Sequence, residues 1–243
     1  SRGLGDVYKR QVSYCLSIRD PRIADTSQSN GFESDNNASG AETTPFTSAH
    51  FKNVTMIGPK TIKNADFVNN GDYITAGDLF PDNGSKLGRF QAAVQIRRSS
   101  KLNISNMLAV GFPIGLIVDG EKGQSVAYAK AGDFKLENIV FANMDAVGTD
   151  KNKEYDDYLF DYLTGTEDRS QQSFSHTFFL SNPGNKIIGE AALQLSDPAN
   201  TGQNYCPTTE ISDGRGGYVG AFKNASDDWM KDWTNFDPQN TPY

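Results

Sequence analysis

Short apolar runs separated by turn residues dominate the first 150 residues of the chain. Apolar positions there do not recur at the three- and four-residue spacing of an amphipathic helix. Runs of this length, bounded by Gly, Asn, Asp and Ser, are instead typical of β-strands. The pattern therefore predicts a protein that is built mainly from short strands.

Three of these runs align with one another. Residues 53–58, 106–111 and 138–143 each begin with Asn, continue with apolar residues and end with Gly or Asn. Each run is preceded by another apolar residue, respectively Phe51, Ile104 and Leu136. A repeated strand unit is typical of a solenoid, in which stacked coils bury a continuous apolar column. Asn tolerates the left-handed conformation needed at a corner, and equivalent Asn side chains can form a hydrogen-bonded ladder.

The spacing of the repeats, about 53 and 32 residues, exceeds one plain coil, so loops must be inserted between the rungs. Polar segments at 27–44, 61–89, 151–170 and 197–217 are predicted to be these loops, with a short helix through 156–163. An antiparallel β-sandwich also has short strands and polar loops, and periodicity alone does not exclude it.

Composition narrows the classes of partner. Hydrophobic residues make up 37% and aromatic residues 11% of the chain, which is too apolar for a disordered protein. The net charge of −7 without a basic stripe disfavours nucleic acid and anionic membranes. No apolar run approaches the roughly 20 residues of a membrane span.

Cys15 and Cys206 lack metal-ligand spacing, and both a disulfide and two separate thiols remain open.

Both ends of the chain carry specific expectations. The opening SRGLGDVYKRQ, residues 1–11, has the character of a translated sequencing adapter and is set aside as non-native. Residues 12–243 are then expected to form a single, N-terminally truncated domain. Its last part, 218–243, is predicted to be a C-terminal cap, with Trp229, Trp233 and Phe236 covering the last coil.

Several segments carry a resemblance to a known family. They are VSYCLSIRDP at 12–21, Ala24–Asp25, SNGFESDN at 29–36, Ile96–Arg98, VGFPIGL at 110–116, YVGAF at 218–222, Asp228–Trp229 and WTNF at 233–236. In these segments the chain resembles a Bacteroidetes-type family of secreted or outer-membrane-associated proteins. The fold of that family is a pectin-lyase-like, right-handed parallel β-helix. The resemblance covers nearly the whole chain after residue 12.

The resemblance implies an all-β, right-handed parallel β-helix with long inserted loops. It also implies a secreted or cell-surface protein, with an export signal or lipid anchor upstream of this segment. It supplies no activity, because lyases, hydrolases and passive adhesins share this fold.

Charged residues provide weak candidates for a site. Glu33 and Asp35 are hard oxygen ligands in a loop, which suits calcium, but Asp is also an ordinary turn residue. Arg97 and Arg98 follow an apolar run, and some β-helix polysaccharide lyases use an arginine base beside calcium. Adjacent residues on a strand face opposite ways, so one of the two could face a groove. Pairing of either arginine with a carboxylate is the competing, structural interpretation.

Other catalytic signatures are weaker still. The adjacent carboxylates at 156–157 and 227–228 lie in polar segments, and glycoside hydrolysis needs two carboxylates at a defined separation. Neither His50 nor His176 belongs to a recognisable catalytic motif, and no Gly-x-Ser-x-Gly turn occurs.

Aromatic residues gather in the acidic insert. Exposed aromatic rings beside carboxylates can bind sugars, which makes Tyr155 and Tyr158 candidate ligand-binding residues. The alternative is that these rings cover the flank of the helix.

Two functions therefore remain. The favoured one is a non-catalytic, secreted or surface-exposed β-helix protein that binds glycans or has a structural role. The other is a polysaccharide lyase or glycoside hydrolase, with Arg97 or Arg98 and the Glu33–Asp35 cluster in a groove.

Overall fold

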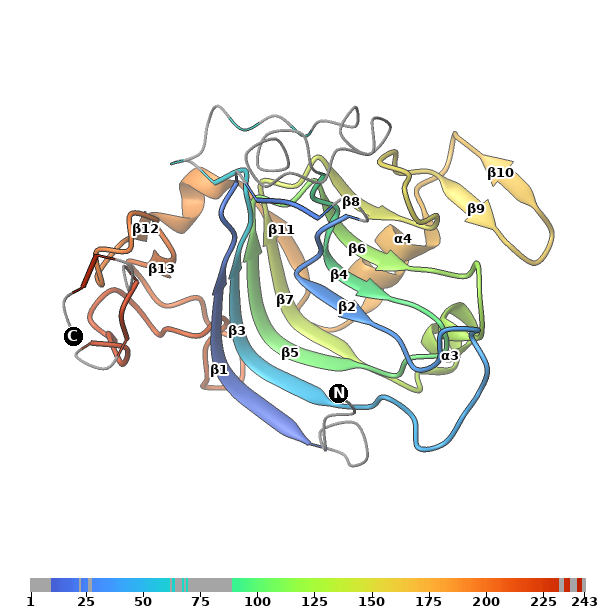
Figure 1. The fold of residues 1–243 in the computed structure, drawn as a ribbon, viewed down its shortest axis with the longest axis horizontal. Coiled ribbons are helices and arrows are strands. Elements are labelled where there is room, and N and C mark those ends of the chain that lie inside the picture. The colour runs from blue at the N-terminus through green and yellow to red at the C-terminus, as the bar shows by residue number, and fades with distance from the viewer. Residues whose placement is uncertain are drawn as a thin grey trace.

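Two parallel sheets form the framework of the protein in the computed structural model (Figure 1). The structure describes residues 10–21, 23–25, 28–61, 63, 67, 69, 89–231, 234–236 and 240–241. The long-strand sheet has the order β1 (Gln11–Ile18), β3 (His50–Ile57), β5 (Asn103–Val110), β7 (Leu136–Ala142) and β11 (Lys186–Ile188). The short-strand sheet has the order β2 (Phe32–Ser34), β4 (Ala92–Ile96), β6 (Ile114–Val118) and β8 (Ala146–Thr149). The chain alternates between the sheets, so each coil adds one strand to each. The pairing within both sheets is parallel, which excludes the antiparallel sandwich.

The predicted Asn repeat is confirmed. The strand register places Asn53 beside Asn106, and Asn106 beside Asn138. All three are left-handed, with φ of 53°, 56° and 54°. Asn138 Nδ2 donates to Asn106 Oδ1 at 3.1 Å, whereas Asn53 Nδ2 donates to the carbonyl oxygens of Tyr218 and Gly220. The aligned asparagines therefore mark a bend at the same position in β3, β5 and β7, and one hydrogen bond between asparagines joins the last two.

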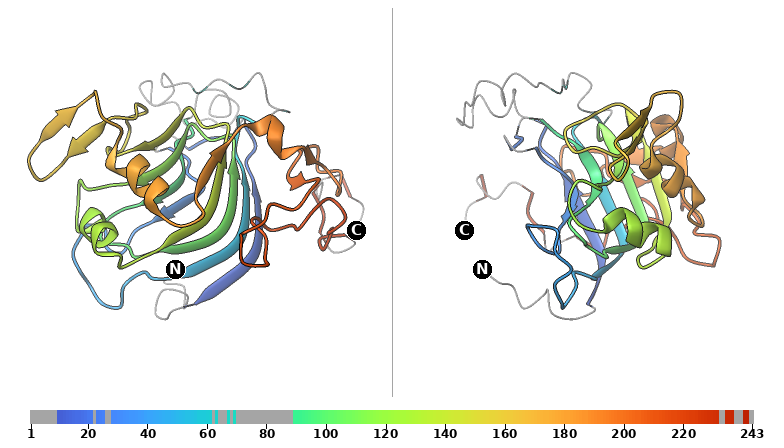
Figure 2. Two further views of the ribbon diagram at one scale, coloured as in Figure 1. Left: turned by 180° about the vertical axis from the view of Figure 1, so that it is seen from behind. Right: turned by 90° about the vertical axis from the view of Figure 1, so that its right-hand side faces the viewer.

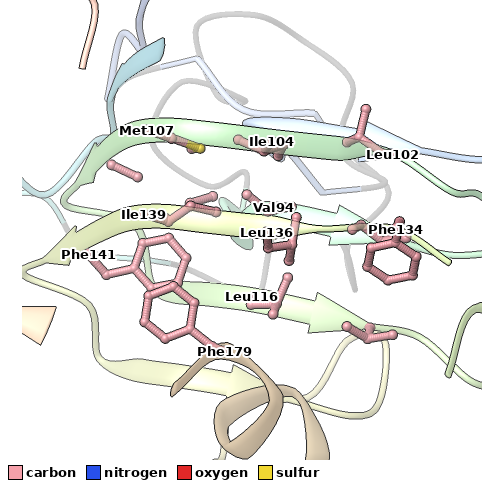
Figure 3. Close-up of a cluster of buried hydrophobic side chains, with 14 of the residues drawn as sticks. Val94, Leu102, Ile104, Met107, Leu116, Phe134, Leu136, Ile139, Phe141 and Phe179 are labelled. Atoms are coloured by element: carbon pink, nitrogen blue, oxygen red, sulfur yellow. The ribbon is translucent and has the colours of Figure 1, made fainter. Parts of the chain in front are cut away.

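The interior between the sheets is filled by apolar side chains from consecutive rungs (Figure 3). Ile104, Met107, Leu116, Leu136 and Ile139 are all buried to 1% exposure or less. Inward and outward side chains alternate on either side of the Asn bend, and the bend shifts the alternation by one residue, so that Ile104 and Met107 both face inward. The inner faces of the strands thus form the continuous column expected of stacked coils.

A helix covers the last complete coil. The helix α4 (Phe174–Ser181) packs on β8 and β6 and lies across the rear of the stack in the view of Figure 1 (Figure 2, left). Phe179, which is fully buried, stacks on Phe141 of β7 with ring centroids 4.2 Å apart. Asp150 fixes the start of the helix, because its carboxylate accepts hydrogen bonds from the backbone amides of Phe174 and Ser175.

A second apolar cluster lies on the outer face of the long-strand sheet. Leu108, Val110 and Val140 point outward and are buried under the C-terminal segment, which contributes Tyr205 and Phe222. This segment contains a 3₁₀ helix, η2 (Glu190–Leu193), and the short strands β12 (Leu195–Ser196) and β13 (Cys206–Pro207). It therefore covers the side of the solenoid.

Trp229 belongs to this side cluster. Its ring stacks on Phe222 at 5.2 Å, and its Nε1 donates to the carbonyl of Ala221 at 3.0 Å. Trp233 lies outside the described residues, and Phe236 is 43% exposed. The predicted covering of the last coil by these three aromatic residues stays a prediction.

The insert after β8 differs from its prediction. Instead of a helix through 156–163 it forms an antiparallel hairpin of β9 (Leu159–Asp161) and β10 (Thr166–Asp168). Gly165, with φ of 68°, allows the tight turn, and Asp150 accepts a hydrogen bond from the amide of Phe160. A short helix, α3 (Ser125–Ala131), connects β6 to β7. Segment 27–44, predicted as a loop, contains β2, and most of 61–89 lies outside the described residues.

The two thiols lie on opposite faces of the long-strand sheet. Cys15 packs against the inner cluster, whereas Cys206 is buried in the outer one, and both are free. Burial raises the pKa of Cys15, and it raises that of Cys206 to about 12. Two separate thiols, rather than a disulfide, are therefore present.

Candidate functional site

An open groove of about 1480 Å³ crosses the outer face of the long-strand sheet. Its floor is made by outward side chains of β1, β3, β5 and β7, on the half of each strand before the Asn bend. One row of the floor joins Lys52, Ser105 and Glu137, which are direct partners on three consecutive rungs. A parallel row consists of Gln11, His50, Asn103 and Lys135. Neighbouring rungs of a sheet are about 4.8 Å apart, so the floor repeats polar groups at that interval along the solenoid.

Two loops border this floor. Residues 45–48, which lead into β3, line it beside the start of the strands. Residues 213–217, from the C-terminal segment, line it beside the Asn bend, where Asn106 Nδ2 donates to Asp213 Oδ2 at 3.2 Å. The C-terminal segment therefore both covers the outer apolar cluster and borders the groove.

The groove carries more cations than anions, although the chain as a whole has a net charge of −7. Its charged lining residues are Arg10, Lys52, Lys101, Lys135 and Arg215, against Asp133, Glu137 and Asp213. Lys101 pairs with Asp133 at 2.8 Å, and Arg215 approaches Glu137 at 3.8 Å. Lys52 is exposed and forms no ion pair with any residue that the structure describes. Positive charge without an ion pair among the described residues therefore lies on the β3 rung of the floor.

His50 and Ser105 form a polar pair on this floor. His50 Nε2 lies 2.8 Å from Ser105 Oγ. Burial and the charge of Lys52 lower the pKa of His50, against the opposite effect of Glu137. The imidazole is therefore mostly neutral at pH 7, and because Nε2 is bound to Ser105, Nδ1 is the ring nitrogen left for a ligand.

The arginine candidates and the acidic candidates are brought together at the end of the short-strand sheet. Arg97 donates from Nε to Asp35 Oδ1 at 2.6 Å and from Nη2 to Glu33 Oε1. Arg98 donates to Asp35 Oδ2 at 2.9 Å. Burial alone would lower the pKa of Arg97, but the hydrogen bond and charge of Asp35, with the charge of Glu33, raise it. Both guanidinium groups therefore form hydrogen-bonded ion pairs with carboxylates of this cluster.

A third carboxylate lies on the next rung. The backbone amide of Arg97 bonds to β2, and that of Asp119 bonds in the same way to β4, so Asp119 follows Arg97 along the stack. Asp119 is only 4% exposed. Burial raises its pKa, although the charges of Arg97 and Arg98 act in the opposite direction.

The Glu33–Asp35 pair is hydrogen-bonded to protein groups. Glu33 Oε1 and both oxygens of Asp35 accept from guanidinium groups, and Glu33 Oε2 accepts from Asn30 Nδ2 at 3.3 Å. Calcium takes six to eight oxygen ligands, and the calcium site at these two carboxylates stays a prediction. Within the described part of the chain, no three His, Cys, Asp or Glu side chains are grouped as metal ligands.

The two candidate tyrosines lie against the flank of the solenoid. Tyr158 is only 4% exposed, and the Arg169 guanidinium covers its ring at 4.1 Å from the centroid. The Tyr155 hydroxyl donates to the carbonyl of Phe90 at 3.0 Å, and Arg89 covers its ring at 4.2 Å. Tyr158 is thus buried, and one face of the Tyr155 ring is covered by Arg89, while sugar binding by these two residues stays a prediction.

The second histidine serves the start of α4. His176 Nδ1 lies 2.5 Å from Asp157 Oδ2, and the other oxygen of Asp157 accepts from Ser173 Oγ at 2.7 Å. Because Asp157 is shared by the helix cap and the histidine, this group stabilises the helix end.

The sequence did not predict the groove. Its floor joins side chains that lie far apart in the chain, and their register depends on the lengths of the inserts. The available signal was the polar residue that alternates with the apolar ones just before each Asn, namely Lys52, Ser105 and Glu137.

None of the helices in the described residues has the length and apolar character needed to cross a membrane. No curated protein and no solved structure shows a significant match to the chain. Residues 18–182 match the family model described as a pectate-lyase-like β-helix domain. The matched span begins at the end of β1 and ends just after α4, so it contains the coils from β2 to β8. It also exceeds half of the chain, and the protein therefore belongs to the family of pectate-lyase-like β-helix domains.

Proposed function

We propose that this protein is a non-catalytic, secreted or surface-exposed β-helix protein that binds glycan chains in the outer groove of the long-strand sheet. The observation that carries the proposal is the pair of polar rows that crosses successive rungs. A linear polymer presents similar hydroxyl groups at regular intervals, and the floor presents side-chain donors and acceptors at regular intervals.

The charge of the groove supports a preference for acidic glycans. Lys52, on the β3 rung of the floor, has no ion pair among the described residues, and the lining residues carry an excess of cations. A glycan with carboxylate or sulfate groups would gain charge-assisted hydrogen bonds from these residues. The polar, partly exposed floor suits a ligand that keeps much of its hydration.

The test is retardation in native gels cast with neutral and acidic polysaccharides. We expect an acidic polysaccharide to retard the protein, and Lys52→Glu to abolish the retardation. Lys186→Glu is the matched control, because Lys186 is also an exposed lysine on a strand of the same sheet but lies outside the groove. Retardation that survives Lys52→Glu, or retardation by no glycan, would refute the proposal.

Polysaccharide cleavage is the second candidate, and one observation favours it: Arg97, Arg98 and two carboxylates are gathered in one cluster. The same contacts count against an arginine base. A general base works best when its pKa lies near the working pH, and the carboxylates raise the pKa of Arg97. Assaying the same incubations for unsaturated products, with and without calcium, decides between the two functions. Products that disappear in Arg97→Ala would establish the lyase.

A further inference from the structure

A second pocket lies on the flank of the solenoid, between the helix α3 and the hairpin of β9 and β10 (Figure 1). Its volume is about 400 Å³, which lies within the range of roughly 300 to 1,000 Å³ that small-molecule sites occupy. It shares no lining residue with the groove on the long-strand sheet. A ligand in this pocket would therefore be separate from the glycan of the proposed function.

Aromatic and aliphatic side chains form most of its walls. Val126 comes from α3, Phe160 from β9, and Phe174 from the start of α4. The ring of Tyr162 makes an edge-to-face contact with that of Phe160, with centroids 4.8 Å apart. Leu163 also lines the pocket and is 94% exposed, so this part of the wall faces water. An apolar group bound here would gain free energy by covering it.

Two opposite charges line the same pocket without an ion pair. Lys130, on the last turn of α3, extends Nζ over the ring of Phe174 at 5.4 Å from the centroid. Asp161, at the end of β9, accepts from the amide of Leu163 with Oδ1 at 2.8 Å. Among the residues that the structure describes, neither charge pairs with the other or with a third side chain. Both charges are thus available to a ligand.

The second carboxylate of the lining, Asp150, is already satisfied. Its side chain belongs to a residue that is 3% exposed. Oδ1 accepts from the backbone amide and the hydroxyl of Ser175, and Oδ2 accepts from the amides of Phe160 and Phe174. This carboxylate therefore holds the hairpin and α4 in place, and it leaves the recognition of a charged ligand to the other two charged residues.

We infer that this pocket binds a free aromatic α-amino acid. Such a molecule carries a carboxylate, an ammonium group and an apolar ring, and the pocket offers a partner to each. Lys130 pairs with the carboxylate and Asp161 pairs with the ammonium group, in charge-assisted hydrogen bonds. The ring lies among the aromatic walls, where offset and edge-to-face contacts are favourable. A ligand with only one of the two charges would face a like charge on the other side, and a neutral sugar would use neither.

The test is a titration of the isotope-labelled protein with L-phenylalanine, followed through the NMR shifts of backbone amides. Two matched probes each lack one charge, since 3-phenylpropanoate has no ammonium group and 2-phenylethylamine has no carboxylate. Glycine keeps both charges and lacks the ring. We expect L-phenylalanine to shift the amides of Ala127 and Phe160, which line the pocket, in a saturable way. Each of the other probes should bind at least about fivefold more weakly.

Two variants separate the two contacts. Lys130→Gln should weaken the binding of L-phenylalanine about fivefold and should not weaken that of 2-phenylethylamine. Asp161→Asn should weaken L-phenylalanine by a similar factor and should not weaken 3-phenylpropanoate, while its amide oxygen can still accept from Leu163. Lys122→Gln is the matched control, because Lys122 is an exposed lysine in the connection before α3 and lies outside the pocket.

Three results would overturn the inference. One is the absence of a saturable shift with L-phenylalanine, or an equal affinity for it and for either singly charged probe. Another is a set of shifts confined to the groove around His50, which would place the ligand in the other site. The third is a loss in Lys122→Gln as large as that in Lys130→Gln, which would reduce the binding to a general attraction of charge.

Discussion

Asn138 donates a side-chain hydrogen bond to Asn106 across 3.1 Å, which joins two consecutive rungs at their bends. Both residues are 5% exposed and have positive φ. We expect Asn106→Ala to cost about 2 to 4 kcal/mol in the free energy of unfolding, because Ala is strained in the left-handed region and the Asn138 donor loses its partner. Urea denaturation measures this loss. Asn106→Gly also removes the hydrogen bond, but glycine adopts the left-handed conformation without strain, so its loss in the free energy of unfolding should be smaller. Equal losses for the two variants would contradict the prediction.

The stacked pair of Phe141 and Phe179 predicts that α4 stabilises the end of the solenoid. Phe179→Ala removes a fully buried ring, and we expect a loss of about 3 to 5 kcal/mol in the free energy of unfolding. Leu163→Ala is a suitable control, since Leu163 is 94% exposed and its removal should change stability little. Similar melting temperatures for the two variants would show that α4 contributes little to the stack.

Asp119 predicts a dependence of stability on pH. Burial raises its pKa in the folded state, so its contribution to stability is present below its ordinary pKa near 3.8 and is lost as the pH rises through the raised value. An asparagine side chain at this position would keep an oxygen that can accept from the amide of Glu121 without carrying the charge. We therefore expect Asp119→Asn to be more stable than the parent at pH 7 and equal to it at pH 3. Urea denaturation at both values measures the difference, and a gain that is independent of pH would contradict the prediction.

The two thiols should react at very different rates. Cys206 is fully buried and its pKa is raised to about 12, so it should resist alkylation at pH 8 until the protein unfolds. Cys15, which is only partly buried, should react first. Mass spectrometry of the native protein after iodoacetamide treatment should show one modification, located on Cys15. Modification of native Cys206 would mean that the C-terminal segment detaches readily from the sheet.

The sequence was most informative where backbone conformation restricts the residue type. The Asn repeat was found because a left-handed bend favours Asn, and the three bends align in the structure as predicted. The short-strand sheet has no such marker, and β2 was therefore assigned to a loop. A helix was predicted through 156–163, where the first strand of the hairpin lies, because the contact of Phe160 with Asp150 cannot be seen from local sequence. The groove depends on register across inserts, which short-range patterns do not encode.

The polar floor of the groove repeats its side chains at a constant interval, so the length of each row is set by the number of coils. Each rung adds one outward side chain to each row, while the loops that differ in length leave the line of the strands. A coil gained or lost during evolution would therefore add or remove one side-chain position in each row, while the positions on either side would keep their spacing. If the proposed function holds, selection could in this way match the number of coils to the length of the glycan that the groove binds.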